Sequence, residues 1–323
     1  MTVFSRNKKY NFEGESLLIV DGSFHLYRSY YAFSFLVNEK SFQTGAIYGF
    51  IKTLRMLILN YEPTYVTVVF DSKEKGFRRK LFNSYKCNRP KTPDDLIVQI
   101  DPLKLMIQLM GVPVVTVPKA EGDDVIGSLV YRSIRHENIT ILISTGDKDL
   151  AQLVKKNVLL IDPLRNILGP EEIFNKYGVY PNLIADFFAL AGDRSDNIPG
   201  IPGVGKKTAV NLLNQIGPIK KIYQNLSKID FLQMRSPGKI RETLLNNQDT
   251  AILFRKITTI VKNLDLTQCY SNLSIKNPNS IVLKSLFIDY GFKKWLSYSR
   301  SKDWFLYQDK TKSVLNLFFG RVV

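Results

Sequence analysis

The sequence of 323 residues has few of the side chains that bind zinc or form disulfides. It contains two cysteines, Cys87 and Cys269, and two histidines, His25 and His136. The cysteines form no C-x-x-C pair, which excludes a disulfide framework and argues against a zinc site. We therefore expect a reduced, cytoplasmic protein.

Long apolar runs and nucleotide-binding loops are also missing. No apolar run reaches the roughly 18 residues of a membrane-spanning helix, and the first 15 residues are polar and lack the apolar segment of a signal peptide. The segment GVGKKT at 203–208 lacks the spacing of a P-loop, GxxxxGK[ST]. The sequence thus predicts neither membrane contact nor triphosphate chemistry.

Acidic residues are the minority, with 29 Asp and Glu against 45 Lys and Arg, a net charge of +16 and a pI of about 9.6. Such a balance favours a polyanionic partner. An AT-rich genome, which enriches lysine, would explain part of the basicity. It would not explain the placement of the acids, because most of the excess base lies after residue 200.

Apolar, β-branched runs of strand length alternate with segments of helical period, which predicts an α/β protein with a mostly parallel sheet and helices on both faces. After about Pro170 the strand pattern fades, and short helices separated by Gly/Pro turns are expected. The predicted strands are Leu17–Val20, Tyr65–Phe70, Val112–Val117, Ile139–Ser144 and Val158–Ile161, and the predicted helices cover about 45–60, 95–110 and 122–136.

Acidic residues follow the predicted strands repeatedly, where ligands of open α/β sheets gather. Taken singly, an Asp after a strand is more often a turn residue or a helix N-cap than a ligand. Independent capping does not explain five such clusters in register with the strand ends. The nine acids are Asp21, Asp71, Glu121, Asp123, Asp124, Asp147, Asp149, Asp193 and Asp196.

Packing so many carboxylates together is unfavourable unless divalent cations neutralise them. Mg²⁺ and Mn²⁺ prefer oxygen ligands. Two such ions about 3.5–4 Å apart activate a water and stabilise the leaving oxygen of a phosphodiester. The pattern therefore predicts two Mg²⁺ or Mn²⁺ ions and phosphoryl transfer.

A basic segment leaves directly from Asp71. Residues 73–91 carry eight Lys and Arg against one Glu, interleaved with aromatic residues. A solvated charged loop is the alternative interpretation, but cations and aromatics beside a two-metal site suit the phosphates and bases of a single strand. We expect Lys86 and Arg78 to contact the scissile phosphate as catalytic groups.

A glycine-rich turn, GIPGVGKKT at 200–208, joins two short helical segments. Turns of this kind present backbone groups to a DNA phosphate or to a monovalent cation, and Lys206 and Lys207 would add charge at the start of the next helix. An ordinary hairpin of two helices is the alternative. Gly200, Gly203 and Gly205 complete this expected DNA contact.

Together these motifs resemble the 5′ nuclease (flap endonuclease/5′–3′ exonuclease) domain of bacterial DNA polymerase I and its stand-alone relatives. The motifs that carry the resemblance are IVDGSFHLYRSYYAF, VVFDSKEKGFRRKLFNSYKCNR, VPKAEGDDVIGSL, STGDKDLAQLV, LAGDRSDNIPGIPGVGKKTA and LFIDYGFKKWL. They extend from about Leu17 to about Leu296, and the chain looks like a stand-alone bacterial member with a PIN-like fold.

The resemblance implies roles for individual residues. Asp21, Asp71, Glu121 and Asp123 would bind chiefly one ion and Asp147, Asp149, Asp193 and Asp196 chiefly the other, with Asp124 in support. The segment 73–93 looks like the arch or clamp, with Arg78, Tyr85, Lys86 and Arg89, and Arg28 would contact substrate phosphates. The turn is similar to a helix–three-turn–helix (helix-hairpin-helix) element, whose potassium ion would be bound by carbonyls of Leu190, Ala191, Pro199, Ile201 and Val204.

The resemblance also implies the organisation and the activity. We expect a flexible segment 1–16, an α/β catalytic domain 17–180, a helical domain 181–298, and a tail 299–323 that is either a linker remnant or a docking segment. The expected activity is structure-selective 5′–3′ hydrolysis of duplex DNA at 5′ ends, nicks and flaps, giving 5′-phosphorylated products during primer and flap removal in replication and repair. A monomer acting with a separate DNA polymerase is expected.

Two other functions fit parts of the pattern. A non-catalytic DNA-binding protein would gain affinity by losing acids near the phosphates, so the acid set argues against it. A small ribonuclease with an acidic site would not predict the basic segment or the glycine-rich turn.

Overall fold

The computed structural model describes residues 14–293 and 295, except 75, 136–138 and 267–272. The expected tail 299–323, most of the expected N-terminal segment, His136, Cys269 and Leu296 lie outside this range. Among the described residues, no helix has both the length and the apolar character to cross a membrane.

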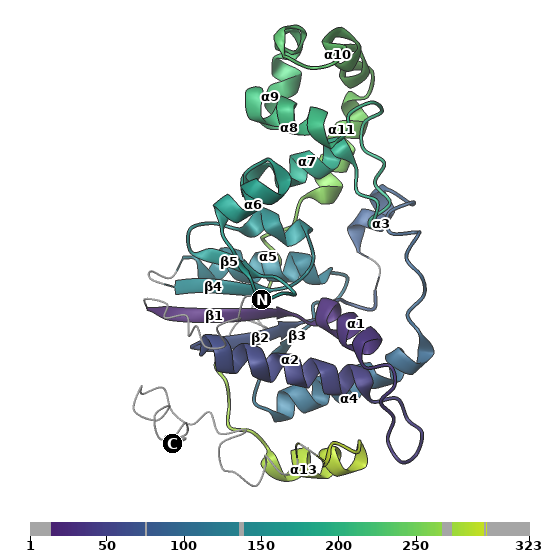
Figure 1. Cartoon of the computed structure of the whole chain (residues 1–323), viewed down its shortest axis with the longest axis vertical. Coiled ribbons are helices and arrows are strands. Elements are labelled where there is room, and N and C mark those ends of the chain that lie inside the picture. Colours follow the sequence, from purple (N-terminus) through teal and green to yellow (C-terminus); the bar gives the residue numbers. More distant parts are fainter. Residues whose placement is uncertain (1–13, 75, 136–138, 267–272, 294, 296–323) are drawn as a thin grey trace, which may run out of the picture.

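A six-stranded sheet forms the centre of the molecule, in the order β3-β2-β1-β4-β5-β6 (Figure 1). The first five strands pair in parallel and β6 is antiparallel to β5. β3 is shorter than predicted, and Pro113, which lacks a backbone N–H, directly precedes it. The strands are β1 Glu15–Asp21, β2 Tyr65–Val69, β3 Val114–Val115, β4 Ile139–Ser144, β5 Val158–Ile161 and β6 Ile167–Leu168.

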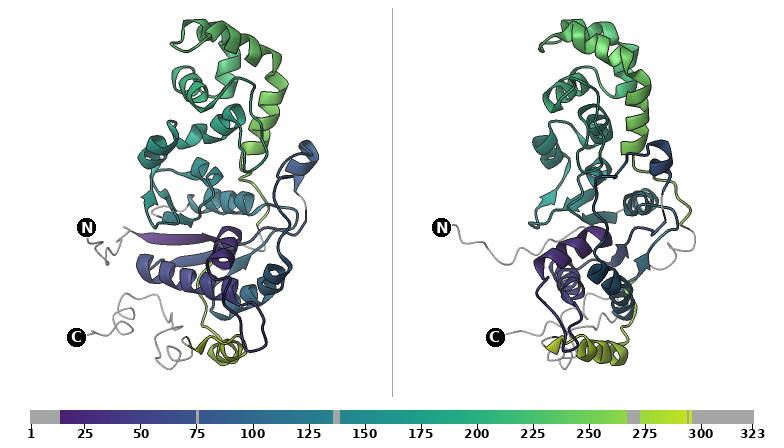
Figure 2. Two further views of the ribbon diagram at one scale, coloured as in Figure 1. Left: turned by 45° about the vertical axis from the view of Figure 1, so that its right-hand side comes forward. Right: turned by 90° about the vertical axis from the view of Figure 1, so that its right-hand side faces the viewer.

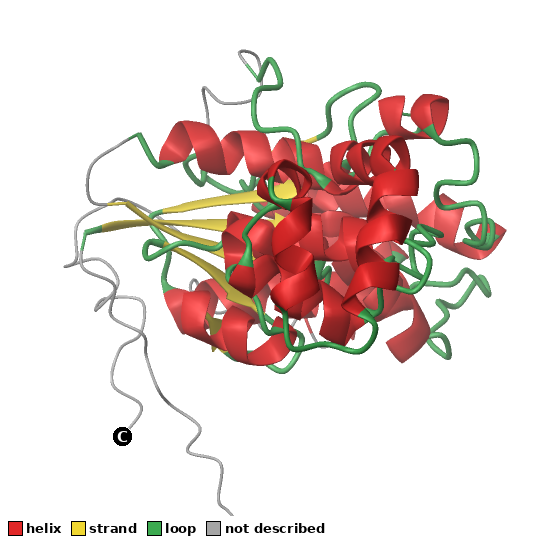
Figure 3. Cartoon of the chain, turned by 90° about the horizontal axis from the view of Figure 1, so that it is seen from above, coloured by secondary structure: helices red, strands yellow, loops and turns green. Residues whose placement is uncertain are grey.

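Both faces of the sheet are buried, as near-continuous apolar strands require. Leu18 and Val20 of β1 pack into one core, with α1 (Gly22–Ala32), α2 (Gly45–Tyr61) and α4 (Asp94–Leu109). Leu17 and Ile19 point to the other core, with α5 (Gly122–Ser133). The mostly parallel sheet with helices on both faces is confirmed, and Figure 3 shows helices flanking the strands.

The second core continues into a helical part above the sheet (Figures 1 and 2). α7 is its central element, since it packs against α11 and α8. The helices of this part are α6 Pro170–Tyr177, α7 Ile184–Ala191, α8 Lys206–Gln215, α9 Ile219–Gln224, α10 Pro237–Asn246 and α11 Gln248–Thr258, with 3₁₀ turns η2 Pro181–Leu183 and η3 Leu226–Phe231.

The chain then returns to the α/β part. α13 (Ser280–Asp289) packs against α4, at the end of the molecule opposite the helical part. Leu283, Phe287 and Trp295 are buried in the same core as α2. The expected helical domain 181–298 therefore needs correction, because these apolar side chains are buried against the catalytic part.

The start of the chain differs from expectation at two places. β1 begins at Glu15, inside the segment expected to be flexible, and α1 follows β1 without a loop. Asp21 caps α1 through its side chain. Gly22 permits the sharp change of direction, since a Cβ there would lie 2.7 Å from the carbonyl oxygen of Val69.

Candidate active site

The predicted acids meet at the carboxyl edge of the sheet. Chain order reverses around β1, which lies between β2 and β4, and this switch point is where open α/β sheets bind ligands. Asp21 ends β1, Asp71 follows β2, and Glu121 precedes α5. The other acids come from α5 (Asp123, Asp124), from the turn after β4 and the 3₁₀ turn η1 Asp149–Leu153 (Asp147, Asp149), and from the turn after α7 (Asp193, Asp196).

Hydrogen bonds to Asp21 and Asp71 fix the first group of carboxylates. Asp21 Oδ1 accepts from the Phe24 amide at 3.0 Å, and its Oδ2 accepts from Thr145 Oγ1 at 2.7 Å. Asp71 Oδ1 accepts from the Gly122 amide at 2.5 Å. The bonds of Asp21 join the end of β1 to α1 and to the turn after β4, and the bond of Asp71 joins the end of β2 to the start of α5. The two carboxylates are therefore held by the fold itself.

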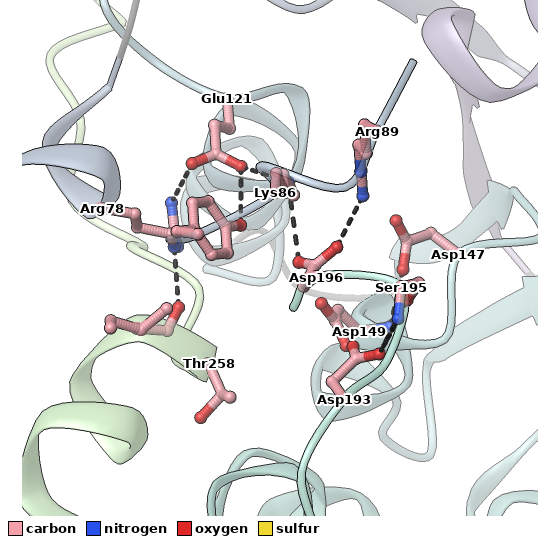
Figure 4. Close-up of polar contacts among 12 residues, drawn as sticks. Arg78, Lys86, Arg89, Glu121, Asp147, Asp149, Asp193, Ser195, Asp196 and Thr258 are labelled. Carbon is pink, nitrogen blue, oxygen red and sulfur yellow. Dashed lines mark hydrogen bonds and ion pairs between the residues drawn. The ribbon is translucent and has the colours of Figure 1, made fainter. Parts of the chain in front are cut away.

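The second group combines the turn after β4 with the turn after α7. Asp149, Asp193 and Asp196 each place a carboxylate oxygen within 4.8 Å of the other two (Figure 4). Asp193 exchanges two backbone hydrogen bonds with Ile198, at 2.7 and 2.8 Å. Asp147 Oδ1 accepts from the Asp149 amide at 2.9 Å. Elements far apart in sequence thus form one acidic cluster.

Burial and mutual repulsion disfavour the charged form of several of these carboxylates. Burial, with added repulsion from Asp147 and Asp71, raises the pKa of Asp21 to about 7. Burial and the charge of Asp147 also raise the pKa values of Asp123 and Asp149 well above their ordinary range. The site therefore carries more negative charge than its surroundings stabilise.

The donor set fits divalent cations that take oxygen ligands. Asp149 Oδ1 is buried and has no hydrogen-bond partner among the described residues, which is costly for a carboxylate unless a cation faces it. The three clustered side chains of the second group are all carboxylates, the hard ligands that Mg²⁺ and Mn²⁺ prefer.

The basic segment docks directly on the second group. The Lys86 amide donates to the Asp196 carbonyl at 3.0 Å, and Asn197 Nδ2 donates to the Ser84 carbonyl at 2.7 Å. Lys86 adopts a left-handed φ of 54°, which costs roughly 1 kcal/mol for a residue with a Cβ. The hydrogen bond from its amide to the Asp196 carbonyl stabilises this conformation, so the segment 84–89 lines one side of the site in a defined conformation.

Lys86 links the two acidic groups. Its Nζ lies 2.5 Å from Glu121 Oε2 and 3.7 Å from Asp196 Oδ2, while Arg89 Nη2 lies 2.6 Å from Asp196 Oδ1 (Figure 4). Tyr85 is buried, and its hydroxyl donates to Glu121 Oε2 at 3.0 Å. Burial alone would raise the pKa of Glu121, but the nearby cations Lys86 and Arg78 outweigh it and lower that pKa.

Arg78 has a different position from the one expected. Its guanidinium makes five hydrogen bonds, at 2.6 and 2.7 Å to Asp124, at 3.2 Å to Glu121, and at 2.7 and 2.9 Å to the carbonyls of Ile257 and Thr259. The residue is only 3% exposed. The Arg78–Asp124 pair thus joins the basic segment, α5 and the end of α11.

These contacts revise two expectations. A buried guanidinium with its donors occupied is not free to contact a scissile phosphate, so the position argues against a catalytic role for Arg78. Asp124 turns both oxygens to Arg78 and to the Val261 amide, which argues against a place among the metal ligands.

The glycine-rich turn joins α7 to α8, as expected. Gly203, Gly205, Lys206 and Lys207 are exposed at the start of α8. Gly200 is buried with a φ of +74°, and a Cβ there would lie 2.6 Å from the Leu190 carbonyl oxygen. Its role is to allow close backbone packing, which argues against direct contact with DNA.

The five residues expected to bind potassium lie around this turn. The Ile201 amide donates to the Leu190 carbonyl at 2.8 Å, and the Val204 amide donates to the Ile201 carbonyl at 2.9 Å. Ala191 directly follows Leu190, and Pro199 lies two residues before Ile201. The potassium site stays a prediction.

Arg28 lies on α1, where its Nη2 donates to the Pro163 carbonyl at 3.0 Å. It lines a cavity of about 550 Å³ together with Lys52, Arg55 and Arg165. The expected phosphate contact is therefore accompanied by three further cations that the sequence patterns did not single out.

Comparison with family models identifies both parts of the molecule. Residues 16–178 match the model of a 5′–3′ exonuclease N-terminal resolvase-like domain, and residues 179–280 match that of a 5′–3′ exonuclease C-terminal SAM fold. The chain belongs to the 5′–3′ exonuclease family. It is a nuclease.

Relatives within the family are of two lengths. The 5′–3′ exonuclease of Buchnera aphidicola subsp. Baizongia pistaciae is 38% identical over 296 residues, covering 91% of this chain and 95% of that protein. The 5′–3′ exonuclease of Aquifex aeolicus is 40% identical, covering 84% and 90%. DNA polymerase I of Pseudomonas aeruginosa is 39% identical over 87% of this chain, which spans 31% of that polymerase.

Solved structures show the same fold. The bacteriophage T5 5′-exonuclease with bound zinc gives a TM-score of 0.64 at 20% identity, covering 86% of this chain and 99% of its own. The T5 flap endonuclease in a pseudo-enzyme–product complex with DNA and metal ions gives 0.61 at 20% identity, covering 88% and 99%. The 5′ nuclease fold and the helical C-terminal part are confirmed.

Some residues of this exonuclease site escaped prediction from sequence. Lys148 and Ser195 both contact the Asp193 carboxylate, and Thr145 holds Asp21. The available signal was position, since Lys148 stands between two predicted ligands in the turn after β4. Its partner Asp193 lies 45 residues away, so the pairing could be found only in three dimensions.

Proposed function

We propose that this chain is a structure-selective 5′–3′ exonuclease that hydrolyses duplex DNA at 5′ ends, nicks and flaps and leaves 5′-phosphorylated products. The observation that carries the proposal is the acidic cluster at the sheet edge, with the raised pKa values of Asp21 and Asp149 and the unpartnered Asp149 oxygen. A protein that only bound DNA would gain nothing from this charge.

Two divalent cations, Mg²⁺ or Mn²⁺, would be bound by the two carboxylate groups. When bound, such ions lower the pKa of water and stabilise the charge on the leaving oxygen. We assign Asp21, Asp71, Glu121 and Asp123 to one ion and Asp147, Asp149, Asp193 and Asp196 to the other. Asp124 is left out because it pairs with Arg78.

The basic segment would hold the scissile strand. Lys86 lies between Glu121 and Asp196, so its ammonium reaches both metal groups from the open side. Arg89 is half exposed beside it and would bind the next phosphate. Tyr85 fixes the Glu121 carboxylate by hydrogen bonding.

Two groups of cations outside the acidic cluster suit a duplex. The exposed Lys206 and Lys207 at the start of α8 would bind duplex phosphates, with Gly203 and Gly205 allowing close approach. A potassium ion at the turn would strengthen this contact. Arg28 and the cations around its cavity would bind further phosphates of the substrate.

The cellular role we propose is primer and flap removal in the cytoplasm, by a monomer that works beside a separate DNA polymerase. The similarity to part of a polymerase I chain supports this, because that protein joins the same family of nuclease to a polymerase. The low cysteine content, two residues in the whole chain, is in keeping with the proposed cytoplasmic location.

Cleavage of labelled flapped, nicked and 5′-recessed DNA with Mg²⁺ and with EDTA tests the proposal. We expect Lys86→Ala to lower kcat by at least about a hundredfold, the scale of losing one charge-stabilising donor, with a much smaller effect on Kd. Lys91→Ala, an exposed lysine of the same basic segment, is the matched control. Absence of Mg²⁺-dependent cleavage on all three substrates would refute the function, and equal loss in the two variants would refute the role of Lys86. A flap with a blocked 5′ end separates endonuclease from exonuclease activity.

A further inference from the structure

The second carboxylate group contains a cation of its own, Lys148. Its ammonium group contacts the Asp193 carboxylate and lies 2.7 Å from Ser195 Oγ. It also lies over the Phe188 ring, 5.1 Å from the centroid. Ser195 in turn donates to Asp193 through its amide and its hydroxyl, at 2.9 and 2.7 Å. Lys148 and Asp193 come from different elements, so the contact joins the turn after β4 to the turn after α7.

The carboxylates of the two acidic groups differ in which of them face cations. Asp21 and Asp71 accept hydrogen bonds from neutral donors. Asp193 and Asp196, by contrast, face full positive charges, from Lys148 on one and from Arg89 on the other. A divalent cation binding to Asp193 or Asp196 must approach these charges, whereas one entering between Asp21 and Asp71 meets carboxylates held by neutral groups. The cations of the first group, Lys86 and Arg78, face Glu121 instead.

We propose that Lys148 is a positioning residue that holds Asp193 in the absence of metal and competes with the divalent cation for that carboxylate. The inference rests on the proposed two-metal function. The ammonium needs no large movement to give way, because Ser195 Oγ and the Phe188 ring remain as partners after it leaves Asp193. Lys148 therefore lowers the affinity of the second group for a divalent cation and keeps Asp193 in the geometry that the cation would need.

The expected effect follows from Coulomb repulsion. An ammonium about 5 Å from a divalent cation opposes its binding by enough to change the affinity roughly tenfold, even with the dielectric constant of water. A residue that served only to build the site would have the opposite effect, since its loss would disorder Asp193 and weaken metal binding. The direction of the change in affinity thus separates competition from simple support.

Mn²⁺ titration of the full chain without DNA, followed by the electron paramagnetic resonance signal of free Mn²⁺, tests the proposal. In Lys148→Met we expect one class of sites to bind Mn²⁺ about tenfold more tightly and the other class to be unchanged. In EDTA the same variant should melt at a lower temperature, because Asp193 loses its counter-ion. Lys148→Arg, which keeps the charge, should bind Mn²⁺ as the wild type does. Lys156→Met removes an equal charge from an exposed position outside the cluster and should leave both classes unchanged.

Unchanged or weaker Mn²⁺ binding in a folded Lys148→Met protein would overturn the proposal. Lys148→Gln, which can still donate to Ser195, provides the same comparison if the methionine variant does not fold. Failure of the wild-type protein to bind Mn²⁺ at all would instead overturn the proposed two-metal function. The two failures are distinguished by the wild-type titration alone.

Discussion

Replacing Asp21 by asparagine should stabilise the metal-free protein. Burial and neighbouring carboxylates raise the pKa of Asp21 from its ordinary 3.8 to about 7. At about 1.4 kcal/mol per pKa unit, ionising this group in the folded protein costs roughly 4 kcal/mol. Asparagine removes the charge but can still accept from the Phe24 amide, so the cap of α1 is retained.

The direction of the Asp21 pKa shift determines the pH range over which the stability changes. The folded state binds the Asp21 proton more tightly than the unfolded state, so this contribution to stability is complete below about pH 4 and is lost as the pH rises to about 7. Asp21→Asn should therefore match the wild type near pH 4 and exceed it by up to roughly 4 kcal/mol at pH 8.

Urea unfolding in EDTA at pH 4.5, 6 and 8 measures this difference. Asp101→Asn, on the exposed surface of α4, is the control and should change stability by no more than about 0.5 kcal/mol. In Mg²⁺ the order should reverse, because only the wild type gains from ion binding at the complete group. A variant that is no more stable than the wild type at pH 8, or equally stabilised at all three pH values, would refute the reasoning.

Three further predictions test other parts of the site. Burial, with repulsion from Arg28, lowers the pKa of His25 to about 4. The contribution of His25 to the free energy of unfolding is therefore complete above about pH 6.5 and is lost as the pH falls to about 4. His25→Gln should therefore remove about 2–3 kcal/mol of the acid destabilisation seen in urea unfolding between pH 7 and 4.5, and an unchanged pH profile would contradict it. Arg78→Met should lower the free energy of unfolding by about 3–5 kcal/mol, because it leaves Asp124 buried without its partner; a variant of normal stability with lost kcat would restore the catalytic role. Asp193→Asn should abolish cleavage while fluorescence anisotropy shows DNA binding at least as tight as in the wild type, since it removes a negative charge near the phosphates; normal cleavage would remove Asp193 from the metal group.

The sheet and the acidic edge could be predicted from sequence because both follow from local pattern. Near-continuous apolar runs are buried on both faces, and parallel strands end at the same edge, so acids that follow them come together. Helix α1 could not be predicted, because its buried face carries Gly22, His25 and Ser29 beside Leu26, a mixture without apolar periodicity.

The role of Arg78 could not be predicted, because its surroundings come from the far end of the chain. In sequence it is one of eight cations in a polar segment. Its burial depends on carbonyl oxygens of Ile257 and Thr259, about 180 residues later, and on the bidentate pair with Asp124. Local charge patterns predict that a segment is basic, and only the tertiary contacts separate the cation that holds the fold from those proposed to bind the substrate.

The basic segment therefore belongs to the fold as much as to the site. At one end Arg78 fixes it to α5 and to the end of α11, and at the other Lys86 and Arg89 fix it to Asp196. The contacts at the second end are ion pairs with a proposed metal ligand, so they compete with the same cation that the cluster would bind. Metal binding would free Lys86 and Arg89 for phosphates, while Arg78, which is buried and paired with Asp124, keeps the segment in place. Under the proposed function, Arg78 thus anchors the basic segment, while Lys86 and Arg89 remain able to bind the phosphates of a DNA strand.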